Sequence, residues 1–278
     1  MSEPRLADWL GRRQHREELL TEAHVEGLNA LLDRDGGVPL GLQWLLCAER
    51  VRQSQLGPDG HPRRGDFLPP VELPRRMWAA GEIRFHGTAA AGARVSRNST
   101  VAAIEEKSGR SGALVFVKVD HAFAADGVPW LDERHTIVYR EAAGVAAAAP
   151  AGGALDPDDW QWRRDITTDT VQLFRYSAMT FNGHRIHYDQ RYATEVEGYP
   201  GLVVHGPLMA TWLMNFADRL DAERTLGAFS FRVKAPVFVG ETITLLARAA
   251  GDDALELKVA DSARREIIDA RADLVAGF

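Results

Sequence analysis

The chain has a single cysteine among its 278 residues, so it cannot form an internal disulfide bond. Such sparing use of cysteine is typical of a protein that works in a reducing cytoplasm, which is the location we expect. Cys47 lies in the apolar stretch LQWLLCAER. A buried, unreactive thiol is the simplest interpretation of this residue, because no signature of a nucleophile surrounds it.

Two further features are missing. Basic residues are not in excess, since 33 Lys and Arg stand against 39 Asp and Glu and the net charge is −6, which argues against a nucleic-acid-binding protein. No uncharged apolar run approaches the roughly 20 residues of a membrane span. The start, MSEPRLADWLGRR, is charged and unlike a secretory signal. We therefore expect neither nucleic acid nor membrane as a partner.

What is present is the composition of a packed globular protein, with 45% hydrophobic and 26% charged residues. A stretch rich in Ala, Gly and Pro, AAGVAAAAPAGGA at 142–154, divides the chain. It has few large side chains to pack, which is typical of a linker. The sequence thus predicts two units, residues 1–145 and residues 155–278.

Each unit is expected to combine a helix with antiparallel strands. Apolar spacing predicts helices in TEAHVEGLNALLD and in PLMATWLMNFADRLDA, and the apolar stretch LGLQWLLCAERV follows the first. Gly-Asp and Ser-Gly turn signals between the strands suit hairpins. The expected fold is α+β, with one long helix laid across a curled antiparallel sheet, made twice. Strands are predicted at 78–87, 94–109, 113–124, 133–141, 226–240, 241–251, 254–262 and 266–276.

Three of the nine histidines fall between positions 184 and 205, in FNGHRIHYDQRY and GLVVHGPLMATW. A metal site is disfavoured because the spacing in HRIH is not the i, i+4 spacing of the zinc helix motif. A structural role is open for single residues, since His184 can bond to backbone and His205 can cap the helix that begins at Pro207. Proton transfer is the third interpretation, because histidine titrates near neutral pH.

The stretch VVHGPLMATW adds backbone donors at the start of a predicted helix. Gly206 and Pro207 are interpreted as a helix cap and first helical residue. Since proline has no N–H, the backbone amides of Gly206 and Leu208 are the expected donors to a developing negative oxygen, with the helix dipole behind them. A base next to such an oxyanion site favours chemistry beside a carbonyl, namely enolate formation, hydration or dehydration.

At these residues the chain resembles a known family. YSAMTFNGHRIHYD and GYPGLVVHGPLMAT resemble the MaoC-like, or hydratase-2, branch of the hot-dog superfamily. DGHPRRGDFLPPVELPRRMWAAGEIRFHG resembles the subgroup of mesaconyl-C4-CoA (3-methylfumaryl-CoA) and itaconyl-CoA hydratases. The resemblance implies a double hot-dog fold whose second unit carries the hydratase motif and whose first unit shapes the acyl pocket. It also implies reversible hydration of a short branched C5 dicarboxylyl-CoA to citramalyl-CoA, with coenzyme A as part of the substrate and no metal or other cofactor.

The resemblance assigns roles to single residues. The motif's tyrosine falls on Tyr176, in the substrate pocket, and its final histidine on His187, which accepts a proton from water. The motif's catalytic aspartate is replaced by Asn182, an amide that can orient water but cannot serve as a base. His184 takes a second proton-handling role or contacts substrate. Asp189 is a weaker candidate for holding one of the histidines in its tautomer.

Arginines cluster in HPRRGDFLPPVELPRRM. Solvated loop charge is one interpretation of Arg63, Arg64, Arg75 and Arg76. The other is binding of CoA phosphates or of the substrate's free carboxylate, since the guanidinium pairs with either in bidentate fashion. We expect Arg75 or Arg76 to bind the carboxylate, because both lead directly into a predicted strand. Arg185, inside the histidine stretch, is a further candidate.

Alternatives of function stay open at this point. One is a 3-hydroxyacyl thioester dehydratase of fatty-acid synthesis, which has a longer apolar tunnel. Another is a non-catalytic hot-dog subunit of a larger dehydratase, and a third is a metal-dependent hydrolase. Two units in one chain already supply the pairing that single-unit relatives reach by dimerising, so a further homodimer is possible but not required.

Overall fold

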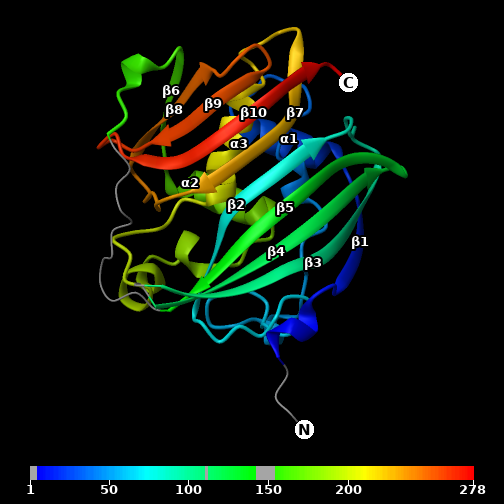
Figure 1. Ribbon diagram of the computed structural model, residues 1–278, viewed down its shortest axis with the longest axis vertical. Coiled ribbons are helices and arrows are strands. Elements are labelled where there is room, and N and C mark those ends of the chain that lie inside the picture. Colours follow the sequence, from blue (N-terminus) through cyan, green and yellow to red (C-terminus); the bar gives the residue numbers. More distant parts are fainter. Residues whose placement is uncertain (1–4, 110–111, 142–153) are drawn as a thin grey trace.

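The computed structural model describes residues 5–109, 112–141 and 154–278. In these ranges ten strands form one antiparallel sheet in the order β1-β3-β4-β5-β2-β7-β10-β9-β8-β6 (Figure 1). Residues 142–153 of the expected linker lie outside the described residues. The boundary between two units therefore stays a prediction, although the first five strands in this order come from one half of the chain and the last five from the other.

The two halves meet along a single pair of strands. β2 runs antiparallel to β7, with Gly81 opposite Phe231, and this pairing makes one sheet of both halves. In the first half the strands are β1 (Arg13–Leu19), β2 (Arg75–Phe85), β3 (Arg94–Gly109), β4 (Gly112–Ala125) and β5 (Val128–Arg140). In the second half they are β6 (Trp162–Thr167), β7 (Arg224–Val233), β8 (Thr242–Ala249), β9 (Ala254–Ala260) and β10 (Glu266–Ala276).

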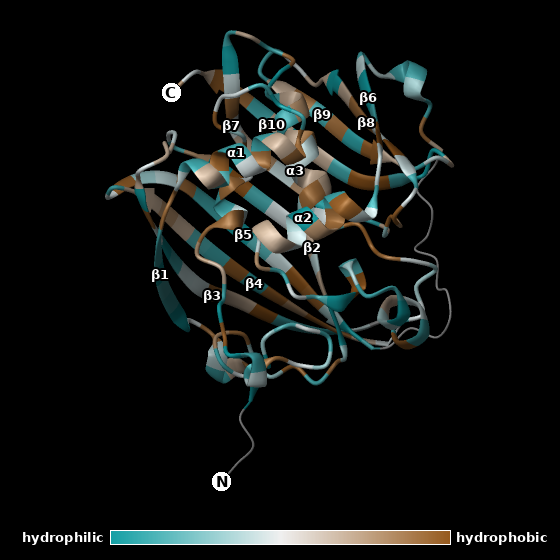
Figure 2. Cartoon of the chain, turned by 180° about the vertical axis from the view of Figure 1, so that it is seen from behind, coloured by the Kyte–Doolittle hydropathy of each residue, from teal (hydrophilic) through white to brown (hydrophobic). Residues whose placement is uncertain are grey.

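The helices lie together on one face of the sheet, as the rear view shows (Figure 2). They are α1 (Glu22–Leu31), α2 (Thr170–Met179) and α3 (Gly206–Ala217). Helix α3 is buried along its whole length after the first turn, because its sequence is apolar on every side. It packs against β7, β8 and β9, so the predicted long helix across a curled sheet is present in the second half.

The stretch LGLQWLLCAERV, which follows α1, forms a 3-10 turn at Leu42–Leu45. Gly41 precedes the turn with a left-handed φ of 98°, a conformation that favours glycine. Backbone groups of Leu40 are bonded to the Asn215 side chain on α3. The space over the sheet is thus shared between this turn and α3.

Three elements were not predicted. Strands β1 and β6 lie at the two edges of the sheet, and each pairs on one side, β1 with β3 and β6 with β8. Their sequences, RQHREEL and WRRDIT, are mostly polar because half or more of each strand faces solvent. Helix α2 begins after Asp169, whose side chain accepts hydrogen bonds from the backbone amides of Val171 and Gln172.

The main core lies between the helices and the sheet and draws on both halves. Leu28 and Phe123 of the first half belong to the same buried cluster as Leu208 and Phe229 of the second. Cys47 is buried at its edge, as expected from its apolar surroundings. In the described part of the chain, no helix has the length and apolar character to span a membrane.

Candidate active site

His187 is held by the backbone in one tautomer. It ends the short 3-10 turn Arg185–His187 and is buried. Its Nδ1 lies 2.7 Å from the carbonyl oxygen of Val203. Because a carbonyl only accepts, Nδ1 of the neutral ring carries the proton, and the lone pair is on Nε2. Burial lowers the pKa of His187 to about 4, so the ring is a neutral proton acceptor at pH 7.

The ring of His205 is stacked on that of His187, and His205 immediately precedes the first residue of helix α3. His205 is the N-cap residue of this helix, as one interpretation of the sequence had it, but its side chain forms no cap hydrogen bond. Instead Nε2 bonds to the Ser177 hydroxyl at 2.9 Å, linking α3 to α2. Burial holds the pKa of His205 well below its ordinary value, with further lowering by the nearby histidines.

Asn182 shapes the loop that carries the histidines. Its Oδ1 accepts the backbone N–H of His184 at 3.0 Å, the local bond of an Asx turn. The ring of His184 stands nearly perpendicular to that of His187, with centroids 5.5 Å apart. Burial lowers the pKa of His184, as do its neighbours His61 and His187. The two histidines of the motif are therefore brought together as neutral groups.

Tyr176 and Gly206 both lie next to His205. Tyr176 on α2 is fully buried, and its ring packs edge-on against His205 at 5.0 Å. Gly206 is the first helical residue of α3 rather than its cap, which is His205. The amides of Gly206 and Leu208 belong to the first turn, where N–H groups have no partner within the helix.

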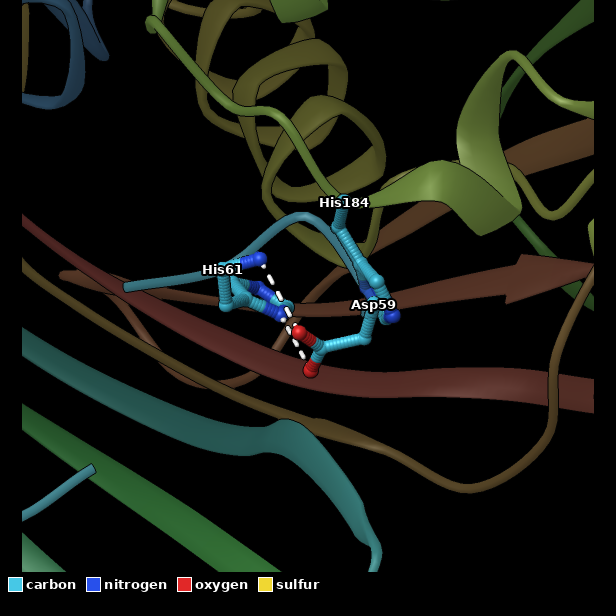
Figure 3. Close-up of side chains that lie close together, drawn as sticks. All are labelled: Asp59, His61 and His184. Carbon is cyan, nitrogen blue, oxygen red and sulfur yellow. Dashed lines mark hydrogen bonds and ion pairs between the residues drawn. The ribbon is translucent and has the colours of Figure 1, made fainter. Parts of the chain in front are cut away.

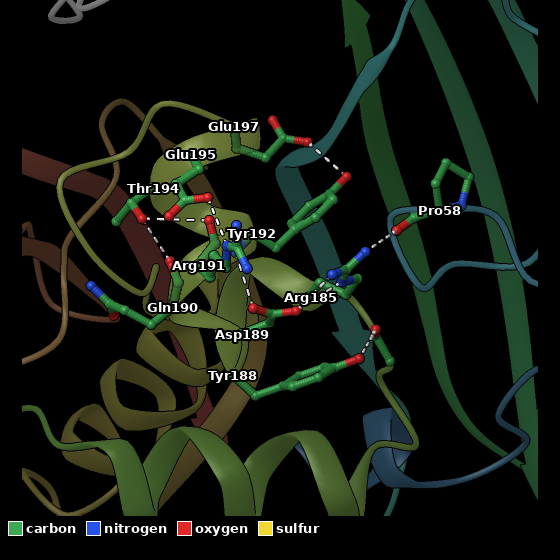
Figure 4. A network of polar contacts seen from close by, with 11 residues as sticks. Pro58, Arg185, Tyr188, Asp189, Gln190, Arg191, Tyr192, Thr194, Glu195 and Glu197 are labelled. Atoms are coloured by element: carbon green, nitrogen blue, oxygen red, sulfur yellow. Dashed lines mark hydrogen bonds and ion pairs between the residues drawn. The ribbon is translucent and has the colours of Figure 1, made fainter.

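Asp189 does not hold a histidine, so that prediction is wrong. Its carboxylate accepts from Arg185 Nε at 3.0 Å and Nη2 at 2.8 Å, and from the backbone amide of Tyr192 (Figure 4). Arg185 in turn donates to the carbonyl oxygen of Pro58. Arg185, held by Asp189, therefore fastens the histidine loop to a loop of the first half.

That loop of the first half, Gly57–His61, brings two more titratable groups to the site (Figure 3). His61 Nδ1 lies 3.1 Å from Asp59 Oδ2, and the His61 and His184 rings are 4.1 Å apart. Asp59, His61 and His184 place ligand-type atoms within 4.8 Å of one another, and they are the group of described residues best placed to hold a metal ion. Sequence reasoning missed this contribution, because 123 positions separate His61 from His184.

The predicted substrate-binding arginines divide into two kinds. Arg64 donates to three backbone carbonyls in the segment 71–74, and Arg75 forms an ion pair with Glu197 at 3.3 Å. Both are thus engaged by protein groups. Arg76 lines the cavity beside the histidines, and its side chain forms no hydrogen bond or ion pair with a described residue. Among these three, Arg76 alone faces the site with its guanidinium unpaired in the described part.

A cavity of about 930 Å³ opens between the two halves. The second half contributes Asn182, Ser177 and Pro207, and the first half contributes His61 and Arg76. His187 and Gly206 are not part of the cavity wall, but their sequence neighbours Tyr188 and Pro207 are. The predicted sharing of one pocket by Asn182, His187 and the Gly206 amide therefore stays a prediction.

The first-half end of the cavity is unexpectedly polar. Glu133 is buried on β5, and its Oε1 accepts from Trp44 Nε1 at 2.7 Å. Polar atoms of Gln43, Arg97, His121 and Glu133 have no hydrogen-bond partner among the described residues. Buried polar groups are normally satisfied, so this wall is suited to water or to a polar group of the substrate. No motif in the sequence marks these residues.

The match to known proteins covers most of the chain. Residues 41–239 match the family model for hydroxyacyl-thioester dehydratase type 2. The chain belongs to this family. It is 42% identical over 251 residues to mesaconyl-C(4)-CoA hydratase of Chloroflexus aurantiacus, covering 88% of this chain and 89% of that relative. It is 34% identical over 89 residues to the mitochondrial hydroxyacyl-thioester dehydratase type 2 of Schizosaccharomyces pombe, covering 31% of this chain and 30% of that protein.

Solved structures show the same fold. A MaoC-like dehydratase superposes with a TM-score of 0.73 at 15% identity, covering 99% of this chain and all of the other. A Mycobacterium tuberculosis protein described as a double hotdog fold superposes with a TM-score of 0.60 at 14% identity, covering 96% of each chain. The α+β double hot-dog fold and membership of a hydratase and dehydratase family, both predicted from the sequence, are confirmed.

Proposed function

We propose that this protein is an acyl-CoA hydratase acting on a short branched C5 dicarboxylyl-CoA, either mesaconyl-C4-CoA or itaconyl-CoA, with citramalyl-CoA as product. The observation that carries the proposal is the 42% identity, over nearly the whole of both chains, to a relative named for hydration of mesaconyl-C4-CoA. The cavity holds a cationic side chain, that of Arg76, with no partner among the described residues, which agrees with a substrate that brings its own carboxylate.

His187 is the base in this proposal. Its Nδ1–H is directed to Val203, so Nε2 has the lone pair that takes a proton from water. The lowered pKa keeps this nitrogen unprotonated at neutral pH, because a buried imidazolium is costly. Asn182, which keeps its Oδ1 on the His184 amide, has its NH₂ group to orient the water.

The first turn of α3 stabilises the enolate. When water adds to the carbon–carbon double bond, negative charge develops on the thioester oxygen. The Gly206 amide stands at the helix N-terminus, where unpaired N–H groups and the helix dipole both favour an anion. Gly206 also has little room for a side chain, since a Cβ atom would lie 3.3 Å from Val233.

Arg76 is the residue we assign to the free carboxylate. A carboxylate loses much hydration on entering a pocket and needs a charged partner there. Arg64 and Arg75 have their guanidinium groups on protein acceptors, whereas Arg76 faces the cavity. Arg97 lines the same cavity, and its buried Nε has no hydrogen-bond partner in the described part of the chain, so it is a second cation within reach of a polar acyl group.

The reaction as proposed moves only protons and water, so it requires no redox cofactor, and coenzyme A enters as part of the substrate. The alternative is a 3-hydroxyacyl thioester dehydratase of fatty-acid synthesis. The partial match to the fission yeast mitochondrial protein favours it, and so does a cavity whose volume of about 930 Å³ accommodates more than a C5 acyl group.

A spectrophotometric screen tests the proposal with mesaconyl-C4-CoA, itaconyl-CoA, crotonyl-CoA and a medium-chain enoyl-CoA. We expect a C5 dicarboxylyl-CoA to give the highest kcat/KM. Arg76→Leu should lower kcat/KM for that substrate about 10- to 100-fold, the size of a lost charge-assisted bond, and spare crotonyl-CoA. Arg191→Leu, at an exposed arginine paired with Glu195, is the matched control. Faster turnover of crotonyl-CoA or the medium-chain substrate would favour the fatty-acyl alternative.

A further inference from the structure

The hydratase motif of this chain has no carboxylate available to its histidines. The motif's aspartate position holds Asn182, whose Oδ1 is bonded to the backbone of His184. The other carboxylate of the stretch, Asp189, is bonded to Arg185 and to the Tyr192 amide. A hydration reaction needs one group to take a proton from water and a source of the proton that reaches the α-carbon. Within the motif, the second group is not evident.

A carboxylate reaches the site from the first half instead. Asp59 Oδ2 lies 3.1 Å from His61 Nδ1, and Asp59 Oδ1 accepts the backbone amide of His61 at 3.0 Å (Figure 3). Since an ionised carboxylate only accepts, Nδ1 of His61 carries the proton, and Nε2 is the nitrogen left for chemistry. His61 lines the cavity and stands against His184, which in turn stands against His187.

The loop that carries this pair is fitted closely to the motif loop. Gly60 has a left-handed φ of 88°, and a Cβ atom on it would lie 1.9 Å from the carbonyl oxygen of Gly183. The Arg185 amide donates to the Asp59 carbonyl oxygen at 2.9 Å. Backbone contacts of this kind fix the relative position of two loops that are remote in sequence. The placement of His61 beside the motif histidines is therefore built into the fold.

Bound metal is the competing explanation for Asp59, His61 and His184. Asp59 is already the acceptor of the His61 proton. The positive charge of Arg76 also lies near enough to lower the pKa of both His61 and His184, and it would repel a bound cation. These observations favour an acid–base pair over a metal centre.

We propose that His61, held by Asp59, is a second catalytic acid–base residue, which exchanges a proton with the α-carbon of the acyl group. This inference rests on the proposed hydratase function. Asp59 is the positioning residue of the pair, because it acts through His61. The site is then assembled from both halves of the chain, with His187 at the water and His61 at the α-carbon.

The proton balance is as follows in the dehydration direction. His61 Nε2 takes a proton from the α-carbon, and the electrons of that C–H bond form the enolate. That proton passes from His61 to His187 Nε2 by way of the intervening His184 or water. The carbon–oxygen bond at the β-carbon then breaks, the double bond forms, and the hydroxyl leaves as water with this proton, so both histidines end neutral, as they began. Hydration is the same sequence reversed.

The charges around His61 determine how easily it holds that proton. Burial lowers the pKa of His61 to about 4, and the Arg76 and Arg64 guanidinium groups lower it too, while Asp59 raises it. His184, neutral through its own lowered pKa, is the remaining titratable group in contact. A substrate carboxylate on Arg76 would weaken the main opposing charge and favour the protonated state of His61.

Kinetics of His61→Ala and Asp59→Asn test this inference with the C5 dicarboxylyl-CoA and its hydrated product. His61→Ala should lower kcat about 100-fold or more in both directions, with KM changed only a few-fold. Asp59→Asn keeps the size of the side chain and should lower kcat about tenfold or more, because the carboxylate stabilises the imidazolium. In His61→Ala the pH profile of kcat should lose one of its limbs.

The chain offers a matched control in His86 and Asp132, a second His–carboxylate pair at 2.9 Å that lies away from the cavity. His86→Ala and Asp132→Asn should leave kcat unchanged. The inference would be overturned if His61→Ala kept wild-type kcat. It would also be overturned if kcat fell but the pH profile stayed unchanged, because His61 would then have only a structural role. A metal site would replace the acid–base pair if the wild-type protein held stoichiometric metal that His61→Ala lacks, and if a chelator abolished the activity and zinc restored it. Wild-type protein inactive on every C5 substrate would overturn the proposed function itself.

Discussion

The imidazole rings of His187 and His205 are stacked, with centroids 3.6 Å apart and planes 19° from parallel. One ring is tied to the backbone of Val203 and the other to the hydroxyl of Ser177. Two positive charges cannot be held at this separation inside a protein without a large cost. The pair therefore remains neutral, and a proton accepted by His187 during turnover is readily released.

His187→Ala should lower kcat about 100-fold or more, the usual contribution of a general acid–base group. The loss should fall on kcat rather than KM, because the lone pair on Nε2 acts on water and not on the bound acyl group. Stopped-flow or steady-state measurements with the best substrate of the screen check this. His15→Ala, an exposed histidine on β1, is the control and should keep wild-type kcat. Full activity in His187→Ala would remove this residue from the mechanism.

Asn182→Asp restores the carboxylate of the general hydratase motif at its own position. The new side chain can still accept the His184 amide, so the loop should keep its shape. A negative charge favours protonated imidazole and so raises the pKa of His184 and His187. The acid limb of the pH–activity profile should therefore move to higher pH. Asn98→Asp, beside the exposed His15, gives the same charge change away from the site and should leave the profile in place.

Arg75→Leu should lower stability rather than change substrate choice. The guanidinium of Arg75 pairs with Glu197 at 3.3 Å and lies over the Tyr199 ring, so it joins strand β2 of the first half to a loop of the second. Both partners are largely buried, and leaving the carboxylate unpaired costs about 1–3 kcal/mol. Thermal unfolding should show a lower Tm, with the ratio of kcat/KM values for mesaconyl-C4-CoA and crotonyl-CoA unchanged. A change in that ratio would return Arg75 to the substrate site.

Stability should fall as the pH is lowered from 7.5 to 5. The pKa of His61 and of His187 is lowered to about 4 by burial, and those of His121, His184 and His205 are also lowered. Below the unfolded-state value of about 6.5, the unfolded chain binds more protons than the folded one, so each group removes about 1.4 kcal/mol per pH unit until its folded pKa is reached.

The measurement is Tm against pH. His121→Gln should flatten the fall, because it removes one of the buried groups. His15→Gln is the matched control: the pKa of His15 is raised by its bonds to Asn98 and Glu17, so removing it should not flatten the fall. A Tm that is constant between pH 7.5 and 5 would show that the buried histidines do not titrate differently in the two states.

Part of the fold follows directly from the sequence. Eight strands and two of the three helices were predicted close to their observed positions, because their apolar residues recur with the period of the element. The edge strands β1 and β6 lack that apolar pattern, because each pairs with only one neighbouring strand and half or more of its residues face solvent. The 3-10 turn in LGLQWLLCAERV, and the bonds of the preceding Leu40 to Asn215 on α3, are likewise not marked by any local pattern.

The site divides in the same way. Its predicted motif residues, Asn182 and His187, are close in sequence, so the histidine stretch and the resemblance were enough to propose them. Asp59, His61 and Arg97 come from the first half, and their approach to the motif depends on strand pairing between the halves and on the docking of the 57–61 loop. A local pattern contains no information about such contacts, so the sequence could not distinguish Arg76 from Arg75.

The pairing of β2 with β7 also determines how copies of this protein can meet. Because that pairing uses one edge from each half, β1 and β6 are the two outer strands of the described sheet. Each is short, with charged side chains such as those of Arg13 and Arg164, and charge at an open edge discourages strand-by-strand growth between molecules. Fibrous association through the sheet is thus opposed at both ends, and a homodimer, if one forms, would use a face or a loop surface instead.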